Sequence, residues 1–191
     1  MAAPGTLFVM ARVPETLHEP LWRPIVDNGL DAMPGTRLSP LRNLHQTLSS
    51  LYPSRERAAL RAACAELEAH AFTLKLERLQ SVKGRPPRIL WMYVPRLGTL
   101  DGVTTLAGAV RSRLRQHGIA EVSGFGPHVT VSYDAASHIT PLDIAPVPWR
   151  IDTIELVEVA GRGSDYRYEV VEAFPLRPPA APPPTQLDLL G

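Results

Sequence analysis

The chain has 191 residues, of which 45% are apolar, and a formal net charge of +1. This balance excludes a disordered chain and a strongly basic nucleic-acid-binding protein, and the length suits one compact unit. The one cysteine, Cys64, excludes an internal disulfide and a cysteine-based zinc site, and it fits a reducing compartment, for which we expect the cytoplasm.

The first quarter of the chain begins with an alternating segment. Apolar residues at every second position of residues 6–13 predict a half-buried strand, and Arg12 within it argues against a signal peptide or a membrane anchor. Residues 15–27 are typical of a helix interrupted by two prolines, and residues 31–43 of a loop. This loop leads into a second predicted strand, LHQTLSSL, at residues 44–51.

A helix is predicted next. Ser54 can cap a helix that runs to about His70, with Leu60, Cys64 and Leu67 along one face. Cys64 is therefore expected in the core, because no neighbour in the sequence would lower its pKa for nucleophilic chemistry.

The middle of the chain has a hairpin pattern followed by a helix pattern. Residues 72–80 and 88–94 are strand-like and are joined by a glycine- and proline-containing turn. Residues 99–117 then form the strongest helix pattern, which Gly118 ends. We expect a solvated face where three arginines flank its apolar stripe: Arg111, Arg113 and Arg115.

Strand patterns return in the last third, at residues 128–133, 149–161 and 166–176, and the last two could pair as a hairpin. After them the composition changes to RPPAAPPPTQLDLLG, and proline at that density favours an extended, mobile segment. We therefore expect one bilobal domain over residues 1–176 and a flexible tail over residues 177–191.

Two short segments share the pattern His-x-Thr followed by an apolar residue: HQTL at residues 45–48 and HVTV at residues 128–131. On a strand, side chains at i and i+2 face the same side, so each motif brings an imidazole and a hydroxyl together. Gln46 and Val129, the intervening residues, then point the other way. Two such motifs suggest a diverged duplication with approximate twofold symmetry.

This set of groups suits a phosphodiester. Thr47 and Thr130 can donate hydrogen bonds to non-bridging phosphate oxygens. Of His45 and His128, a neutral ring can take a proton from water while a protonated ring gives one to the leaving oxygen. Such a reaction requires no metal ion and no cofactor. A plot of activity against pH should be bell-shaped. Because the two histidines titrate as a coupled pair, neither limb of this profile is assigned to a single residue.

Other interpretations of the histidines are weaker. Among sequences with six histidines, about one in a hundred would carry two such motifs by chance, so we favour a functional pair over ordinary strand residues. Two histidines without a nearby carboxylate or thiolate also make a poor metal-ligand set. The remaining histidines lack a threonine two positions later on a predicted strand: His18, His70, His117 and His138.

Over roughly residues 6–176 the chain resembles the two-histidine (2H) phosphoesterases, and among them the bacterial RNA 2′,3′-cyclic phosphodiesterases once named 2′-5′ RNA ligases. The segments that carry the resemblance are LFVMARVPETL, LRNLHQTL, RILWMYV, FGPHVTVS and YRYEVVEAFPL.

The resemblance implies a bilobal α+β fold in which two antiparallel sheets line a central cleft with helices outside. It implies a catalytic tetrad of His45, Thr47, His128 and Thr130 that hydrolyses a 2′,3′-cyclic phosphate on an RNA 3′ end or a nucleotide to a 2′-phosphate. By analogy, His45 is the proton donor and His128 the proton acceptor. A monomer without a metal or cofactor is expected.

The chain departs from its relatives at two positions. Close relatives often carry an arginine five residues after the second histidine, where this chain has Tyr133, and an aromatic residue five after the first, where it has Ser50. Tyr133 could bond a phosphate or stack on a base, so we expect it to bind substrate.

Two further functions stay open at this point. The same acid–base pair could run in reverse and join RNA as a 2′-5′ ligase. A nucleotide- or RNA-binding module could also retain these residues with little turnover.

Overall fold

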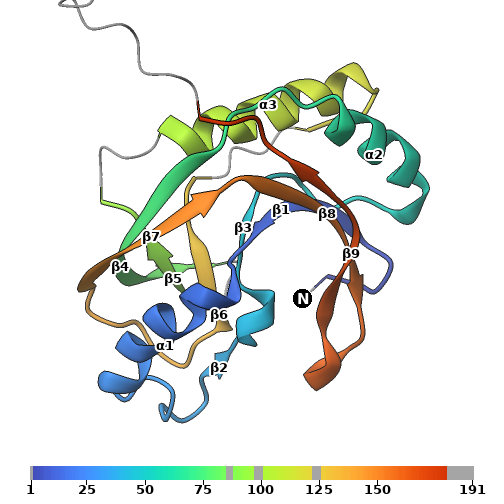
Figure 1. Cartoon of the computed structure of the whole chain (residues 1–191). Coiled ribbons are helices and arrows are strands. Elements are labelled where there is room, and N and C mark those ends of the chain that lie inside the picture. Colours follow the sequence, from blue (N-terminus) through green and yellow to red (C-terminus); the bar gives the residue numbers. More distant parts are fainter. Residues whose placement is uncertain (1, 85–87, 97–100, 122–125, 180–191) are drawn as a thin grey trace, which may run out of the picture.

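The computed structural model describes residues 2–84, 88–96, 101–121 and 126–179, which form two antiparallel sheets with helices outside them (Figure 1). The four-stranded sheet has, in spatial order, β3 (His45–Thr47), β1 (Leu7–Arg12), β8 (Thr153–Ala160) and β9 (Arg167–Pro175). The five-stranded sheet has β2 (Arg37–Leu38), β6 (Val129–Asp134), β5 (Ile89–Val94), β4 (Phe72–Lys83) and β7 (Leu142–Ile151). The α+β class and the two antiparallel sheets that the resemblance implies are therefore confirmed.

The described helices are α1 (His18–Asp27), α2 (Arg57–Ala65) and α3 (Asp101–Gln116). Four short 3₁₀ turns accompany them: η1 (Glu15–Leu17), η2 (Leu41–Asn43), η3 (Ser54–Glu56) and η4 (Gly163–Asp165). Helices α2 and α3 contact each other at one end of the molecule, where α2 also packs against β8 and β9 (Figure 1). Helix α1 lies by β7, away from that pair.

Strand β1 is buried on both faces, so the prediction of a half-buried strand was wrong. Leu7, Val9 and Ala11 join the main core, to which both sheets and the helices contribute. Phe8 and Met10 join a smaller cluster on the opposite face, together with residues of β8. The reason is that both faces of the sheet are covered at β1, because Tyr166 and Tyr168 pack on the smaller cluster opposite the main core.

Several predicted elements are confirmed. Strands β4 and β5 pair antiparallel, as do β8 and β9. The apolar stripe of α3 is buried, and after that helix Gly118 takes a φ of 76° while the Ile119 N–H donates to the Leu114 carbonyl. The predicted first residues of this helix, 99 and 100, lie outside the described part of the chain.

Other boundaries differ for reasons of tertiary structure. Helix α2 ends at Ala65 rather than near His70, because the chain that follows pairs its backbone with Arg177. The predicted loop 31–43 contains β2 and η2, and the second predicted strand is only the three residues of β3.

The segment predicted as one strand at residues 149–161 is two strands in different sheets. Asp152 separates β7 from β8, and the chain passes there from the five-stranded to the four-stranded sheet. The first part of β7 was not predicted because it contains Pro146 and Pro148, and proline lacks the N–H that strand pairing uses. Proline is tolerated at this place because β7 is an edge strand.

The start of the predicted tail is held by the domain. The Arg177 N–H donates to the Ala69 carbonyl at 2.9 Å, and the Ala71 N–H donates to the Arg177 carbonyl at 2.8 Å. Residues 180–191 lie outside the described part of the chain, so a flexible tail stays a prediction. None of the helices in the described ranges is both long and apolar enough to cross a membrane.

Candidate active site

The fold brings the two His-x-Thr motifs together from different sheets. The first lies on β3, an edge strand of the four-stranded sheet, and the second begins at His128, directly before β6 of the five-stranded sheet. Strands β3 and β6 contact each other, although they are about 80 residues apart in the chain. His45 and Thr130 are buried there, and Thr47 and His128 are partly exposed.

The two histidines are held in the same way. His45 Nδ1 lies 2.7 Å from the Asn43 carbonyl oxygen, and His128 Nδ1 lies 2.9 Å from the Gly126 carbonyl oxygen. In each motif the acceptor is two residues before the histidine. A carbonyl oxygen can only accept, so Nδ1 carries the hydrogen and Nε2 of the neutral ring is left with its lone pair. Each motif therefore presents one basic nitrogen.

His45 sits among aromatic rings and is 6% exposed. Its ring centroid lies 5.1 Å from that of Tyr168 and 5.5 Å from that of Phe8. Burial lowers the pKa of His45 from the usual 6.5 to about 4. The Asn43 carbonyl opposes this shift, whereas the positive charges of His128 and Arg12 add to it. In the free protein His45 is consequently neutral at pH 7.

The lowered pKa of His45 predicts a loss of stability in acid. Because the folded-state pKa is about 4 and the ordinary value is 6.5, the unfolded chain binds more protons between these values. His45 therefore destabilises the fold progressively as pH falls from 6.5 to 4, by about 3 kcal/mol in full. Urea unfolding at pH 7 and pH 4.5 should show a smaller pH dependence in His45→Gln than in the natural protein.

The control for this measurement is His138→Gln, which removes an exposed imidazole. An identical pH dependence in His45→Gln and the natural protein would contradict the assignment of the acid sensitivity to His45.

Tyr133 lies with the motif residues because of an irregularity in β6. A shift of register opposite Trp91 and Met92 places one extra residue between Thr130 and Ser132. Such a bulge reverses the alternation of side chains, so Tyr133 comes to the face of Thr130. Tyr133 is 38% exposed, and a hydrogen bond from Thr130 partly offsets the effect of burial, which raises the Tyr133 pKa.

Two tyrosines that the sequence analysis did not single out complete these surroundings. Tyr168, on β9, contacts His45 and Phe8, and its ring meets that of Tyr166 edge to face at 5.5 Å. Both are close enough to Tyr133 to interact with it electrostatically. We define Tyr133, Tyr166 and Tyr168 as the tyrosine cluster. Its only signal in the sequence is the YRY pattern at the start of the closing strand.

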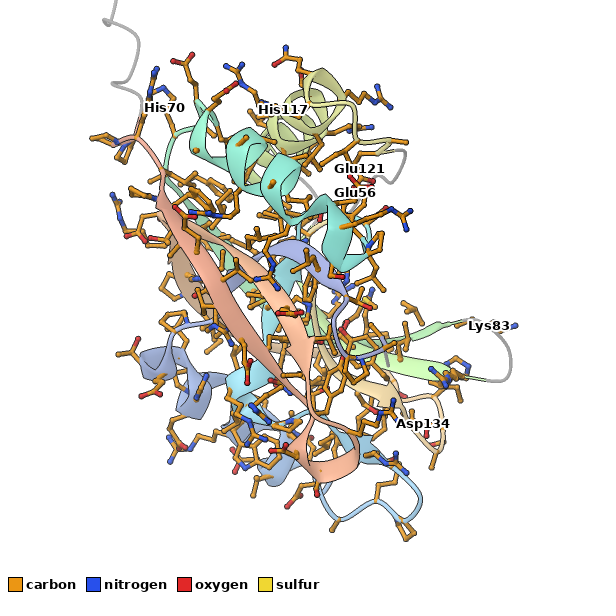
Figure 2. The ribbon with its side chains drawn as sticks, turned by 90° about the vertical axis from the view of Figure 1, so that its right-hand side faces the viewer. Glu56, His70, Lys83, His117, Glu121 and Asp134 are labelled. Atoms are coloured by element: carbon orange, nitrogen blue, oxygen red, sulfur yellow. The ribbon has the colours of Figure 1, made fainter. Side chains whose placement is uncertain are left out.

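A buried carboxylate holds the chain that leaves the first motif. Glu121, which is 1% exposed, accepts hydrogen bonds from the Ser50 N–H at 2.6 Å, the Ser50 hydroxyl at 2.9 Å and the Tyr52 hydroxyl at 2.5 Å. Burial and this bond raise the pKa of Tyr52, which keeps its hydroxyl protonated as a donor. Figure 2 shows Glu121 at the end of the molecule that carries α2 and α3, away from Asp134 at the end of β6. Ser50, one of the two departures from the relatives, thus has a structural partner.

Removing this carboxylate should cost stability, because three donors, of which the Tyr52 hydroxyl is buried and the two of Ser50 are partly buried, would lose their acceptor. We expect Glu121→Ala to lower the free energy of unfolding by about 3 kcal/mol. Urea unfolding at pH 7 measures this loss. Glu66→Ala is the control, since Glu66 makes exposed ion pairs with His117 and Arg113 and should lose less than about 1 kcal/mol. Equal losses in the two variants would contradict the role of Glu121.

In the described part of the chain, features outside the motifs add no competing site. Among the described residues, no three His, Cys, Asp or Glu side chains lie together as a metal-binding group. An open surface hollow on α3 is lined by Gly108, Arg111, Ser112, Arg115 and Gln116, none of which belongs to either motif.

Comparison with known proteins gives a family and a fold. Residues 15–163 match the model of the 2′-5′ RNA ligase superfamily. Among solved structures, the protein TT0787 of Thermus thermophilus is 23% identical, with a TM-score of 0.72 over 91% of this chain and 98% of that one. E. coli LigT in its apo form is 22% identical, with a TM-score of 0.69 over 92% and 99%, and LigT complexed with 3′-AMP is 21% identical, with a TM-score of 0.66 over the same shares. No curated protein matches the chain. At these identities the solved structures show a shared fold.

Proposed function

Because the chain belongs to the 2′-5′ RNA ligase superfamily of 2H phosphoesterases, we propose that it hydrolyses 2′,3′-cyclic phosphates on RNA 3′ ends or nucleotides to 2′-phosphates. The observation that carries the proposal is the pair of motifs on adjoining strands, in which a carbonyl two residues earlier holds each histidine by Nδ1. Both histidines thus keep Nε2 for proton transfer, which acid–base catalysis without a metal requires.

The proposed step is an in-line displacement at phosphorus. A water oxygen bonds to phosphorus while the bond from phosphorus to the 3′ oxygen breaks. His128 takes the proton of the water, and His45 gives a proton to the leaving 3′ oxygen. Thr47 and Thr130 donate hydrogen bonds to the non-bridging oxygens, which gain charge in the transition state.

The pKa of His45 bears on these two roles. With a pKa of about 4, the His45 ring is neutral at pH 7 and has no proton on Nε2, so His45 can act as donor only if the bound phosphate anion raises its pKa. Without such a rise, His45 is the acceptor and His128 the donor. The total charge of the catalytic pair is the same in both assignments, so a pH profile alone does not separate them.

The tyrosine cluster favours a nucleotide substrate. Aromatic rings give nucleobases a stacking surface worth about 1–3 kcal/mol per base. E. coli LigT has been solved in complex with 3′-AMP and with ATP, which supports a nucleotide or an RNA end as the ligand here. The monomeric state and the cytoplasmic location expected from the sequence stay predictions.

The family name keeps 2′-5′ ligation as a second candidate. The test is an RNA that ends in a 2′,3′-cyclic phosphate, incubated with the protein alone and with a second RNA that ends in a 5′-hydroxyl. Opening of the cyclic phosphate at the same rate in both mixtures supports hydrolysis, whereas joining at a comparable rate supports the ligase. Tight binding of 3′-AMP without either reaction would contradict both and favour a binding module.

A further inference from the structure

Gln46, the residue between His45 and Thr47, is fully buried at the boundary of the two sheets. Its carboxamide makes three hydrogen bonds. Nε2 donates to the Thr47 carbonyl at 2.8 Å and to the Gly126 carbonyl at 3.3 Å, and Oε1 accepts from the His128 N–H at 2.7 Å. A residue of the first motif is thus bonded directly to the backbone of the second.

These bonds fit only one orientation of the carboxamide, because a backbone N–H requires an acceptor and a carbonyl requires a donor. The side chain acts like an extra peptide group between the edge strand β3 and the chain that enters β6. A buried amide whose bonds are all made fixes the groups around it, and the loss of one partner leaves the others unsatisfied.

The Gly126 carbonyl is shared. It accepts from Gln46 Nε2 and also from His128 Nδ1 at 2.9 Å. Gln46 therefore fixes the backbone of His128 at its N–H and, at the same time, the carbonyl that orients the His128 ring. The Asn43 carbonyl orients the His45 ring, and among the described residues it accepts no side-chain hydrogen bond from the second motif.

The equivalent position of the second motif is different. Val129 is fully buried in the main core and has no side-chain hydrogen-bonding group. The contact is consequently one-way, from the first motif to the histidine of the second. The approximate twofold relation of the two motifs therefore does not extend to this contact, because the Val129 side chain cannot make the equivalent hydrogen bond.

We propose that Gln46 is a positioning residue that holds the His128 ring in its catalytic orientation and tautomer. The kinetic consequence rests on the proposed function, whereas the structural consequence, a change in the state of the His128 ring, does not.

Two variants test the proposal. Gln46→Met keeps the length and bulk of the side chain but removes all three hydrogen bonds. We expect kcat to fall by about 10- to 100-fold with little change in KM. A displaced catalytic group reduces the stabilisation of the transition state more than it reduces substrate binding.

Gln46→Glu gives a second signature. A protonated carboxyl can donate to the Gly126 carbonyl and accept from the His128 N–H, whereas an ionised one can only accept. The ratio of its kcat to that of the natural protein should therefore rise as pH falls. A purely structural defect would not produce this pH dependence.

Ser49→Ala is the matched control. Ser49 is also a buried polar residue just after the first motif, and its hydroxyl accepts from the Val9 N–H at 2.8 Å without touching the second motif. We expect it to lose stability but to retain kcat within about twofold, because no group near the reacting atoms moves.

The readout that does not need activity is the ¹⁵N spectrum of the His128 ring, recorded where the ring is neutral. The natural protein and Ser49→Ala should show the Nδ1–H tautomer, and Gln46→Met should shift toward Nε2–H. An unchanged tautomer and a kcat within twofold in folded Gln46→Met would overturn the proposal. A tautomer change in a protein that hydrolyses no cyclic phosphate would support the positioning role while removing the proposed reaction.

Discussion

Replacing either motif histidine by alanine should lower kcat for opening a 2′,3′-cyclic phosphate by about 10²- to 10⁴-fold, which is the usual contribution of one acid or base. The reason is geometric, because each ring supplies one Nε2 and no other described imidazole shares its strand face. His45→Ala and His128→Ala should still bind 3′-AMP, since Thr47 and Thr130 keep their hydroxyls.

His117→Ala is the control for this pair of variants. His117 follows α3 and pairs with Glu66 at 3.1 Å, on an exposed part of the surface and outside both motifs. It should retain kcat within about twofold. Near-normal turnover in both motif variants would contradict acid–base catalysis by these histidines, provided that circular dichroism shows them folded.

The second large effect should come from changing the leaving atom. A thiol is far more acidic than an alcohol. In a cyclic phosphorothiolate with sulfur at the 3′ position, the sulfur can therefore leave as a thiolate without a proton donor. For the variant that lacks the donor, the ratio of its kcat to that of the natural protein should be at least about 10²-fold higher on this substrate than on the oxygen substrate. The variant that lacks the acceptor should recover little.

This substrate assigns the two roles. Recovery in His45→Ala makes His45 the donor, as the resemblance implies, and requires the substrate to raise its pKa. Recovery in His128→Ala reverses the roles, in accord with the lowered pKa of His45 in the free protein. Equal recovery of kcat in both variants, or recovery in neither, would contradict the claim that one histidine is the proton donor and the other the proton acceptor.

Local patterns predicted the elements that depend on local contacts. The apolar stripe and terminal glycine of α3, the β4–β5 and β8–β9 hairpins and the two motif strands follow from periodicity and turn residues. The division between β7 and β8 did not, because the change of sheet at Asp152 is a property of the whole fold. Residues on both sides of Asp152 have the same strand pattern.

In the candidate site, too, some features follow from the local sequence and others depend on the whole fold. Spacing alone identified the four motif residues and placed the side chains of each motif on one strand face. Gln46 was expected to point away from the site, and nothing in the sequence indicated that its side chain would reach His128, 82 residues further along. Tyr168 was missed because its contact with His45 joins β9 and β3, the two edge strands of the four-stranded sheet, and that proximity is a property of the folded sheet.

Tyr133 is an instructive intermediate case. Strict alternation from Thr130 would place Tyr133 on the opposite face of β6, and only the bulge opposite Trp91 and Met92 brings the two residues together. Its use as a substrate contact was proposed from the family position and stays a prediction.

The central claim is that the two motifs hydrolyse a cyclic phosphate between them. The most direct measurement is ³¹P NMR of 2′,3′-cyclic AMP incubated with the purified protein and a chelator. We predict that 2′-AMP forms, and that either His45→Ala or His128→Ala lowers its rate of formation by at least about 10²-fold. A 3′-AMP product, or no product from the natural protein, would contradict this claim.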